Sequence, residues 1–204
     1  MTATLVLPAD DTGLSRAAEL LHAGELVAMP TETVYGLAGD ARNDMAVARI
    51  FAAKNRPRFN PLIVHLAQVE QVEQVARMTP LAHKLAQAFW PGPLTLVLPL
   101  LPASGLSALV TAGLDTVAIR LPAHPVARAL LARFGGPLAA PSANPSGRIS
   151  PVSVAHVLAG LEGRIAAVVE GGNCAVGLES TILDATGDTP RLLREGGLAR
   201  EAIA

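Results

Sequence analysis

The sequence predicts one mixed α/β domain over residues 1–204, with a multi-stranded sheet between helices. Short apolar runs rich in β-branched residues alternate along the chain with segments of helical periodicity. Hydrophobic residues make up 50% of the chain, which is ample for a core. No linker, internal repeat or low-complexity segment divides it. Whether neighbouring strands run parallel or antiparallel stays open at this point.

Capping residues and helix breakers place the helices. Asp11 and Thr12 can cap a first helix, whose apolar residues recur at helical spacing until Gly24. Asn43 or Asp44 opens the second helix. The helices expected from such signals cover about 11–24, 43–54, 69–77, 80–88, 123–134 and 151–159, and the tail adds a short one.

Runs of Val, Ile, Leu and Thr between turn residues place the strands. The uncharged stretch 90–114 is long enough to span a bilayer, but its four prolines and three glycines would interrupt a spanning helix. We therefore expect a buried strand there and no membrane association. The expected strands are 26–29, 62–66, 94–98, 116–121, 138–140, 165–170, 180–185 and 191–194.

Charge and cysteine content bound the partners and the compartment. The formal net charge of −1 argues against bulk electrostatic attraction to nucleic acid, although a local basic groove is compatible with it. The single Cys174 cannot form an internal disulfide, and the five histidines lack metal-site spacing. The first eight residues have no basic start or long apolar run. We expect a cytoplasmic protein without a signal peptide.

Three cations, Lys54, Arg56 and Arg58, stand within five residues of a chain that is only 16% charged. Arginine offers a planar fork for bidentate phosphate contacts and lysine a mobile point charge, so this segment can follow a triphosphate. A solvated basic turn would have the same composition. Both interpretations stay open on these residues alone.

Three polar segments are candidate ligand loops. Residues 30–36 follow a strand, where a rigid scaffold can present hydroxyls and backbone N–H groups. Ser142, Asn144 and Ser146 lie in a stiff loop and can donate to phosphate or carboxylate oxygens. Ser180 follows a glycine-containing turn. Ordinary turns favour the same residues for conformational reasons, so a purely structural role stays open.

Two polar residues end otherwise apolar strands. Burying the cation of Arg120 would cost several kcal/mol unless it is paired. It should therefore meet a protein acid such as Glu179 or the carboxylate of a ligand. His65 ends its strand in the same way, and its simplest role is that of a hydrogen-bonded histidine at a strand end.

Several common catalytic motifs are absent from the sequence, including the phosphate loop, the dinucleotide fingerprint and the nucleophile elbow. Cys174 has no basic neighbour in the sequence to lower its pKa. No covalent nucleophile is indicated. The mixture of cations and neutral donors instead favours transfer at a phosphorus atom through positioning and charge stabilisation.

Taken together, these residues resemble the YrdC-like family of threonylcarbamoyl-AMP synthases over nearly the whole chain. The resemblance implies a YrdC-like mixed twisted sheet, with helices on both faces and an open concave substrate groove. The segments that carry it are PTETVYGL (30–37), KNRPRFNPLIVHL (54–66), WPGPLTLVL (90–98), TVAIRLP (116–122), SANPSG (142–147), GLESTI (177–182) and LLREG (192–196).

The resemblance also implies a nucleotidyltransferase activity. In this family ATP, L-threonine and bicarbonate yield threonylcarbamoyl-AMP and pyrophosphate. A separate transferase complex then places the threonylcarbamoyl group on adenosine beside the anticodon of certain tRNAs. Mg²⁺ would bridge the ATP phosphates and keep waters, because no acidic cage is evident in the sequence. The carbamate of threonine would attack the α-phosphorus.

The family's site residues fall on positions of this sequence, and the resemblance implies no metal-ligating side chain. The catalytic tetrad, which binds and polarises the phosphates, is Lys54, Arg56, Ser142 and Asn144. The ATP site comprises Arg56, Asn60, Thr116, Ser142, Ser150 and Arg194. The threonine site comprises Thr33, His65, Arg120 and Ser180, with Arg120 on the carboxylate.

Two positions depart from the family pattern. Relatives often carry threonine at Ala140, near the amino-acid site, so that contact is lost or replaced here. Glu195 stands where proline is common. Glu32 and Glu179 have two open roles: acids behind the site, or partners of arginines and strand ends.

Two alternative functions stay open. One is a relative that has drifted to another carbamoyl transfer, although the complete tetrad argues against it. The other is an RNA-binding module, which the net charge and the 3% aromatic content disfavour as the main role. A weak tRNA contact is compatible with this composition. We expect the short, single-domain form of the family.

Overall fold

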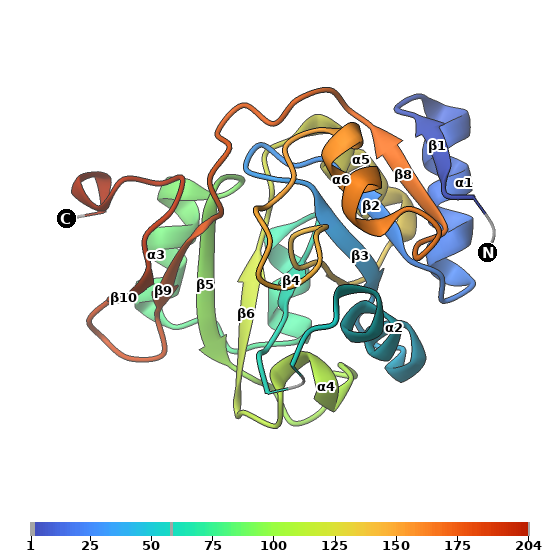
Figure 1. The fold of residues 1–204 in the computed structure, drawn as a ribbon. Coiled ribbons are helices and arrows are strands. Elements are labelled where there is room, and N and C mark those ends of the chain that lie inside the picture. The colour runs from blue at the N-terminus through green and yellow to red at the C-terminus, as the bar shows by residue number, and fades with distance from the viewer. Residues whose placement is uncertain (1–2, 58, 204) are drawn as a thin grey trace.

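The computed structural model describes residues 3–57 and 59–203, so the predicted phosphate contact Arg58 lies outside the described residues. Within these ranges, ten strands form one sheet in the order β1-β8-β2-β3-β7-β4-β6-β5-β9-β10 (Figure 1). The strands are β1 (Leu5–Pro8), β2 (Val27–Met29), β3 (Gly36–Asp40), β4 (Ile63–His65), β5 (Leu94–Pro99), β6 (Thr116–Arg120), β7 (Leu138–Ala139), β8 (Ala167–Glu170), β9 (Thr181–Asp184) and β10 (Arg191–Arg194).

The strand directions, which the sequence left open, are mixed. Strands β1 and β2 both pair in parallel with β8, and the pairs β4 with β6 and β5 with β9 are also parallel. The remaining neighbours are antiparallel. The sheet therefore combines hairpin returns with longer crossover connections.

The helices begin close to the predicted caps. Asn43 caps the second helix, and its side chain accepts hydrogen bonds from the N–H groups of Met45 and Ala46. Asp10 caps the first helix, one residue before the predicted Asp11, because its side chain accepts from Gly13 N at 2.9 Å. The helices are α1 (Asp11–His22), α2 (Asp44–Lys54), α3 (Pro80–Phe89), α4 (Ala108–Thr111), α5 (Pro125–Phe134) and α6 (Val154–Leu161), with 3₁₀ turns η1 (Val69–Gln74) and η2 (Arg200–Ala202).

Three elements were not predicted: β1, β3 and α4. Strand β3 carries two glycines, which weaken a strand signal, but it pairs with β2 on one side and β7 on the other. The predicted helix at 69–77 is only a 3₁₀ turn, and the predicted helix at 151–159 begins at Val154, after Ser153 caps it. These differences follow from long-range pairing and local capping.

The two halves of the sheet are covered differently, as Figure 1 shows. Helices α1 and α5 pack on one face of the half that contains β8, β2, β3 and β7, through a cluster that includes Leu21 and Leu131. Helices α2 and α6 pack on its other face. In the β4-β6-β5-β9 half, alternate residues such as Ile119 and Leu96 point into the core under α3. The expected arrangement, a sheet with helices on both faces, is therefore found in the β8-β2-β3-β7 half.

The opposite face of that second half carries polar side chains in register. His65 on β4 pairs with Arg120 on β6, and Arg120 pairs with Thr95 on β5. All three side chains are buried although the strands are otherwise apolar. Among the described residues, every helix is too short or too polar to cross a membrane.

Candidate active site

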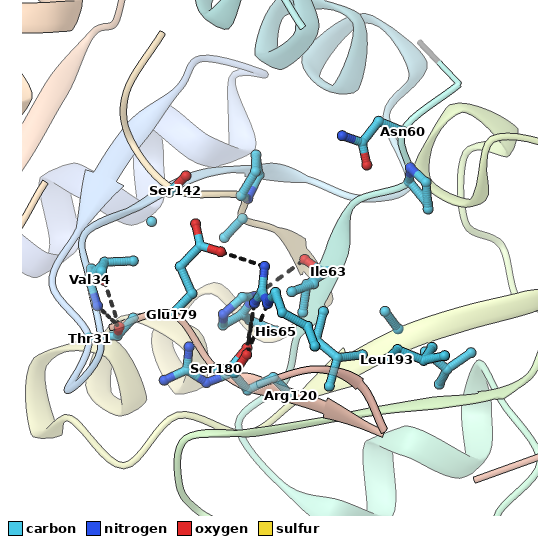
Figure 2. Close-up of a pocket in the computed structure, with 18 of the residues that line it drawn as sticks. Thr31, Val34, Asn60, Ile63, His65, Arg120, Ser142, Glu179, Ser180 and Leu193 are labelled. Atoms are coloured by element: carbon cyan, nitrogen blue, oxygen red, sulfur yellow. Dashed lines mark hydrogen bonds and ion pairs between the residues drawn. The ribbon is translucent and has the colours of Figure 1, made fainter. Parts of the chain in front are cut away.

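A pocket of about 250 Å³ lies on this polar face of the β4-β6-β5-β9 half-sheet. Figure 2 shows Arg120, His65, Ser180 and Glu179 around it, with a dashed line marking the ion pair of Glu179. The pocket brings together most of the site residues predicted from the resemblance. Those that line it are Arg56, Asn60, His65, Arg120, Ser142, Ser180 and Arg194.

Two of the predicted ligand loops are joined along one wall of the pocket. Leu37 N donates to Pro141 O at 2.7 Å, and Ala143 N donates to Tyr35 O at 2.8 Å. Tyr35 is fully buried and anchors the first of these loops. Because both loops are fixed by backbone hydrogen bonds, their polar groups are presented on a rigid scaffold.

Arg120 is buried, and its guanidinium has three acceptors. Nη2 donates to Glu32 Oε1 at 2.6 Å, Nη1 to Thr33 Oγ1 at 2.8 Å, and Nε to Gly92 O at 3.3 Å. A protein acid therefore pairs with Arg120, as one of the two alternatives predicted, but the acid is Glu32. The example named, Glu179, was wrong, because that side chain pairs with another arginine. Burial lowers the pKa of Arg120, and the charge of Glu32 opposes this shift.

His65 is a neutral imidazole beside this guanidinium. Burial, reinforced by the charge of Arg120, lowers the pKa of His65 to about 3. Nδ1 lies 3.3 Å from the carbonyl oxygen of Ile63 and therefore carries the proton, since a carbonyl can only accept. This assignment leaves Nε2 as an acceptor in the pocket wall.

A second ion pair lies at the more open side of the pocket. Arg194 Nη1 donates to Glu179 Oε2 at 2.5 Å, and Arg194 Nη2 donates to Ser180 O at 2.8 Å. Ser150 Oγ donates to Glu179 Oε1 at 2.9 Å. Ser180 Oγ in turn is hydrogen-bonded to Thr95 Oγ1 at 2.7 Å. The pair thus holds β10 against the segment that precedes β9.

Arg56 reaches the same side from the end of α2. Its Nη2 donates to Pro61 O at 3.0 Å and its Nε to Asn60 O at 3.3 Å, so the side chain follows the loop that leads to β4. Burial lowers the pKa of Arg56, and the charge of Glu179 opposes this shift. Arg56 and Arg194 thus place two cations around one carboxylate.

Lys54 lies behind the pocket rather than in its wall. It is 1% exposed, and its Nζ donates to the carbonyl oxygens of Ser142 and Asn144, the latter at 2.5 Å. Ser146 N donates back to Lys54 O at 2.7 Å. Burial and the neighbouring Arg56 lower the pKa of Lys54 to about 8. In this structure Lys54 holds the loop that presents Ser142.

Four further predicted residues lie near the pocket without lining it. Asn144 is buried, with Nδ2 donating to Arg148 O at 2.7 Å, and its Oδ1 has no partner among the described residues. Thr116 lines an adjoining cavity of about 300 Å³ that shares four residues with the pocket. Thr33 is hydrogen-bonded to Arg120 and Ser150 to Glu179, and these two partners line the pocket. Ala140, the departure from the family pattern, lines the pocket.

Sequence reasoning missed Thr95, and it left the role of Glu32 open. Thr95 carried the same signal as Arg120, a polar residue within an apolar strand, and lies opposite it in register. The partner of Glu32 is 88 residues away in the chain, so no local pattern shows the pairing. Among residues 3–57 and 59–203, no three His, Cys, Asp or Glu side chains gather into a metal site.

Comparison with protein-family models gives one decisive match. The Sua5/YciO/YrdC model, described as telomere recombination, matches residues 19–196. The chain belongs to the Sua5/YciO/YrdC family. Among curated members, the threonylcarbamoyl-AMP synthase of Bacillus subtilis (strain 168) is 52% identical over 198 residues, which are 97% of this chain and 57% of that protein. The synthase of Pyrococcus abyssi (strain GE5 / Orsay) is 50% identical over 188 residues, covering 92% of this chain and 55% of that protein.

A solved structure agrees with this membership of the Sua5/YciO/YrdC family. The crystal structure of P. abyssi Sua5 complexed with L-threonine superimposes with a TM-score of 0.93 at 47% identity. The match covers 99% of this chain and 60% of that one. The present chain therefore spans little more than half the length of the two curated relatives. It shares the mixed twisted sheet of P. abyssi Sua5.

Proposed function

We propose that this chain is a threonylcarbamoyl-AMP synthase, which converts ATP, L-threonine and bicarbonate into threonylcarbamoyl-AMP and pyrophosphate. The observation that carries the proposal is a single pocket with two separate arginine centres, one buried and one open. One centre suits the carboxylate of an amino acid and the other suits phosphates. The names of the curated relatives favour this enzyme over an RNA-binding module.

Threonine would occupy the buried end of the pocket. Arg120 would bind its carboxylate, as a fixed guanidinium can. His65 Nε2 would accept a hydrogen bond from the amino acid, and the hydroxyls of Thr33 and Ser180 complete the polar set. This proposal is supported by the L-threonine bound to P. abyssi Sua5.

ATP would occupy the more open end. Arg56 and Arg194 would neutralise the phosphates, with the hydroxyl of Ser142 as a neutral donor. Asn60, Thr116 and Ser150 lie at or beside this end and would hold the rest of the nucleotide. Lys54 and Asn144 would act on catalysis through the loop that carries Ser142.

The residues around the pocket would promote the reaction by positioning the substrates and by stabilising the negative charge of the phosphates. The amine of bound threonine captures carbon dioxide from bicarbonate as a carbamate, whose oxygen attacks the α-phosphorus of ATP and expels pyrophosphate. Mg²⁺ would neutralise phosphate charge. The pocket offers cations and hydroxyls rather than a cage of carboxylates, so the ion would take its ligands from phosphates and water. The product would pass in the cytoplasm to a transferase complex that modifies tRNA.

Pyrophosphate release tests the proposal. With ATP, Mg²⁺ and bicarbonate present, release should depend on L-threonine, and Arg56→Ala should reduce it by about 100-fold or more. Arg128→Ala removes an exposed arginine outside the pocket and should leave the rate unchanged. A folded, ATP-binding wild type whose release does not depend on threonine would refute the proposal.

A further inference from the structure

Glu32 joins three segments around the buried end of the pocket. Its Oε1 is the acceptor for Arg120 Nη2 at 2.6 Å. Its Oε2 accepts from the backbone N–H groups of Ala123 and His124 at 3.1 and 3.3 Å. The side chain of Arg120 is buried, at 5% exposure, and that of Glu32 is largely buried, at 14%. One carboxylate therefore connects the loop after β2, the end of β6 and the start of α5.

The hydrogen bonds of Arg120 leave donors for a ligand. A guanidinium has five N–H bonds, and the described residues use three of them, one each on Nε, Nη1 and Nη2. One N–H on each Nη atom remains. Arg120 lines the pocket, whereas Glu32 does not, so Glu32 lies behind the guanidinium. The acid thus holds the arginine without occupying the place of a ligand.

We infer that Glu32 is a positioning residue, which fixes the guanidinium of Arg120 so that its two remaining Nη N–H groups receive the carboxylate of the amino-acid substrate. The inference rests on the proposed function, because it names how the amino-acid end of the same pocket is built. A buried arginine without an acid would be unpaired and free to take other rotamers. Preorganisation by a partner that the ligand never touches raises affinity by removing that freedom.

If Glu32 were only a structural support, a different result would be expected. A carboxylate that caps backbone N–H groups at the start of α5 would lower stability when removed but would not select between substrates. The discriminating quantity is the preference for a carboxylate. L-Threoninamide has the same side chain and amine as L-threonine but lacks that charge.

The test uses Glu32→Gln, with threonine and ATP affinities measured by calorimetry. Threonine affinity should fall by about 10- to 100-fold, while ATP affinity stays within about twofold. The ratio of threonine to threoninamide in kcat/KM should fall by about the same factor as the affinity for threonine. Glu25→Gln is the matched control, since it removes the acid of an exposed glutamate–arginine pair that does not line the pocket, and it should change neither quantity.

Each outcome decides the inference. A folded Glu32→Gln protein with unchanged threonine affinity and unchanged carboxylate preference would overturn it, while threonine-dependent release by the wild type would leave the proposed function standing. If the wild type itself neither binds threonine nor shows such release, both fall. Should Glu32→Gln not fold, Glu32→Asp retains the charge on a shorter stem and should still weaken threonine binding by about three- to tenfold at normal ATP affinity. Normal threonine affinity in that variant would overturn the inference.

Discussion

Two glutamate–arginine pairs lie at the same pocket. Their N–O separations are nearly equal, but the pairs differ in burial. Glu32 and Arg120 are 14% and 5% exposed with a separation of 2.6 Å, whereas Glu179 and Arg194 are 38% and 36% exposed with a separation of 2.5 Å. The buried pair is expensive to open, because either residue alone would keep a charge largely out of water and without its opposite charge. The open pair can exchange partners at little cost. Burial rather than distance therefore distinguishes their roles. We expect the Glu32–Arg120 pair to stay intact when a ligand binds, and Arg194 to exchange Glu179 for the phosphates of a ligand.

Breaking the buried pair should give the largest effect. Arg120→Ala leaves Glu32 as a largely buried acid without its opposite charge and should lower the free energy of unfolding by about 3 to 5 kcal/mol. Urea denaturation followed by circular dichroism measures this loss. A change below about 1 kcal/mol would mean that the pair is no more structural than a surface contact.

The neutral His65 beside Arg120 makes stability depend on pH. The unfolded histidine binds a proton near pH 6.5, whereas in the folded protein its pKa lies near 3. Between these values the unfolded state holds more protons, so the free energy of unfolding falls as pH decreases, by about 1.4 kcal/mol per unit.

Urea titrations at pH 7 and pH 5 should show the wild type losing about 2 kcal/mol more than His65→Gln. His156→Gln, at an exposed position, serves as the control and should follow the wild type. Equal losses in the wild type and His65→Gln would show that His65 is protonated normally inside the fold.

Breaking the open pair should affect ligand binding more than stability. Arg194→Ala leaves Glu179 half exposed and still bonded to Ser150, so the free energy of unfolding should change by about 1 kcal/mol or less. Affinity for ATP should fall by about tenfold, since one phosphate-binding cation is lost. Calorimetry with ATP checks the second value. A stability loss as large as that of Arg120→Ala would abolish the distinction between the pairs.

The smallest effect is expected at the hydroxyl bond behind Ser180. Thr95→Val removes the partner of Ser180 Oγ while preserving side-chain shape, and should cost about 1 kcal/mol of stability. Threonine affinity should fall only a few-fold, and ATP affinity should not change. An effect on ATP alone would place Ser180 with the open pair instead.

Much of the fold could be predicted from local signals. Asn43 begins α2, and the left-handed residues Asn55 and Gly135 end α2 and α5, close to where the sequence indicated. Strands of β-branched residues were found as expected, but β3 was missed because Gly36 and Gly39 weaken its pattern, and pairing on both sides compensates. Such compensation comes from partners distant in the chain, which a local pattern does not contain.

For the site, the sequence indicated residue types better than their partners. Arg120 was recognised as a buried cation in need of an acid, but the choice between Glu32 and Glu179 depends on how three loops meet in space. Lys54 ends a helix, a position that usually faces solvent, and its burial results from the carbonyl groups of a loop nearly 90 residues away. The pocket's position follows from the sheet order, which the sequence left open.

The most direct test measures both ligands on both arginines. Calorimetric titrations of L-threonine and of ATP would be made on Arg194→Ala and on Arg120→Lys, which keeps a cation beside Glu32 but loses the planar fork. We predict that Arg120→Lys binds threonine at least about tenfold more weakly with normal ATP affinity, and that Arg194→Ala shows the reverse. Equal weakening of both ligands by both variants would contradict the division of the pocket into a fixed carboxylate receptor and an exchangeable phosphate receptor.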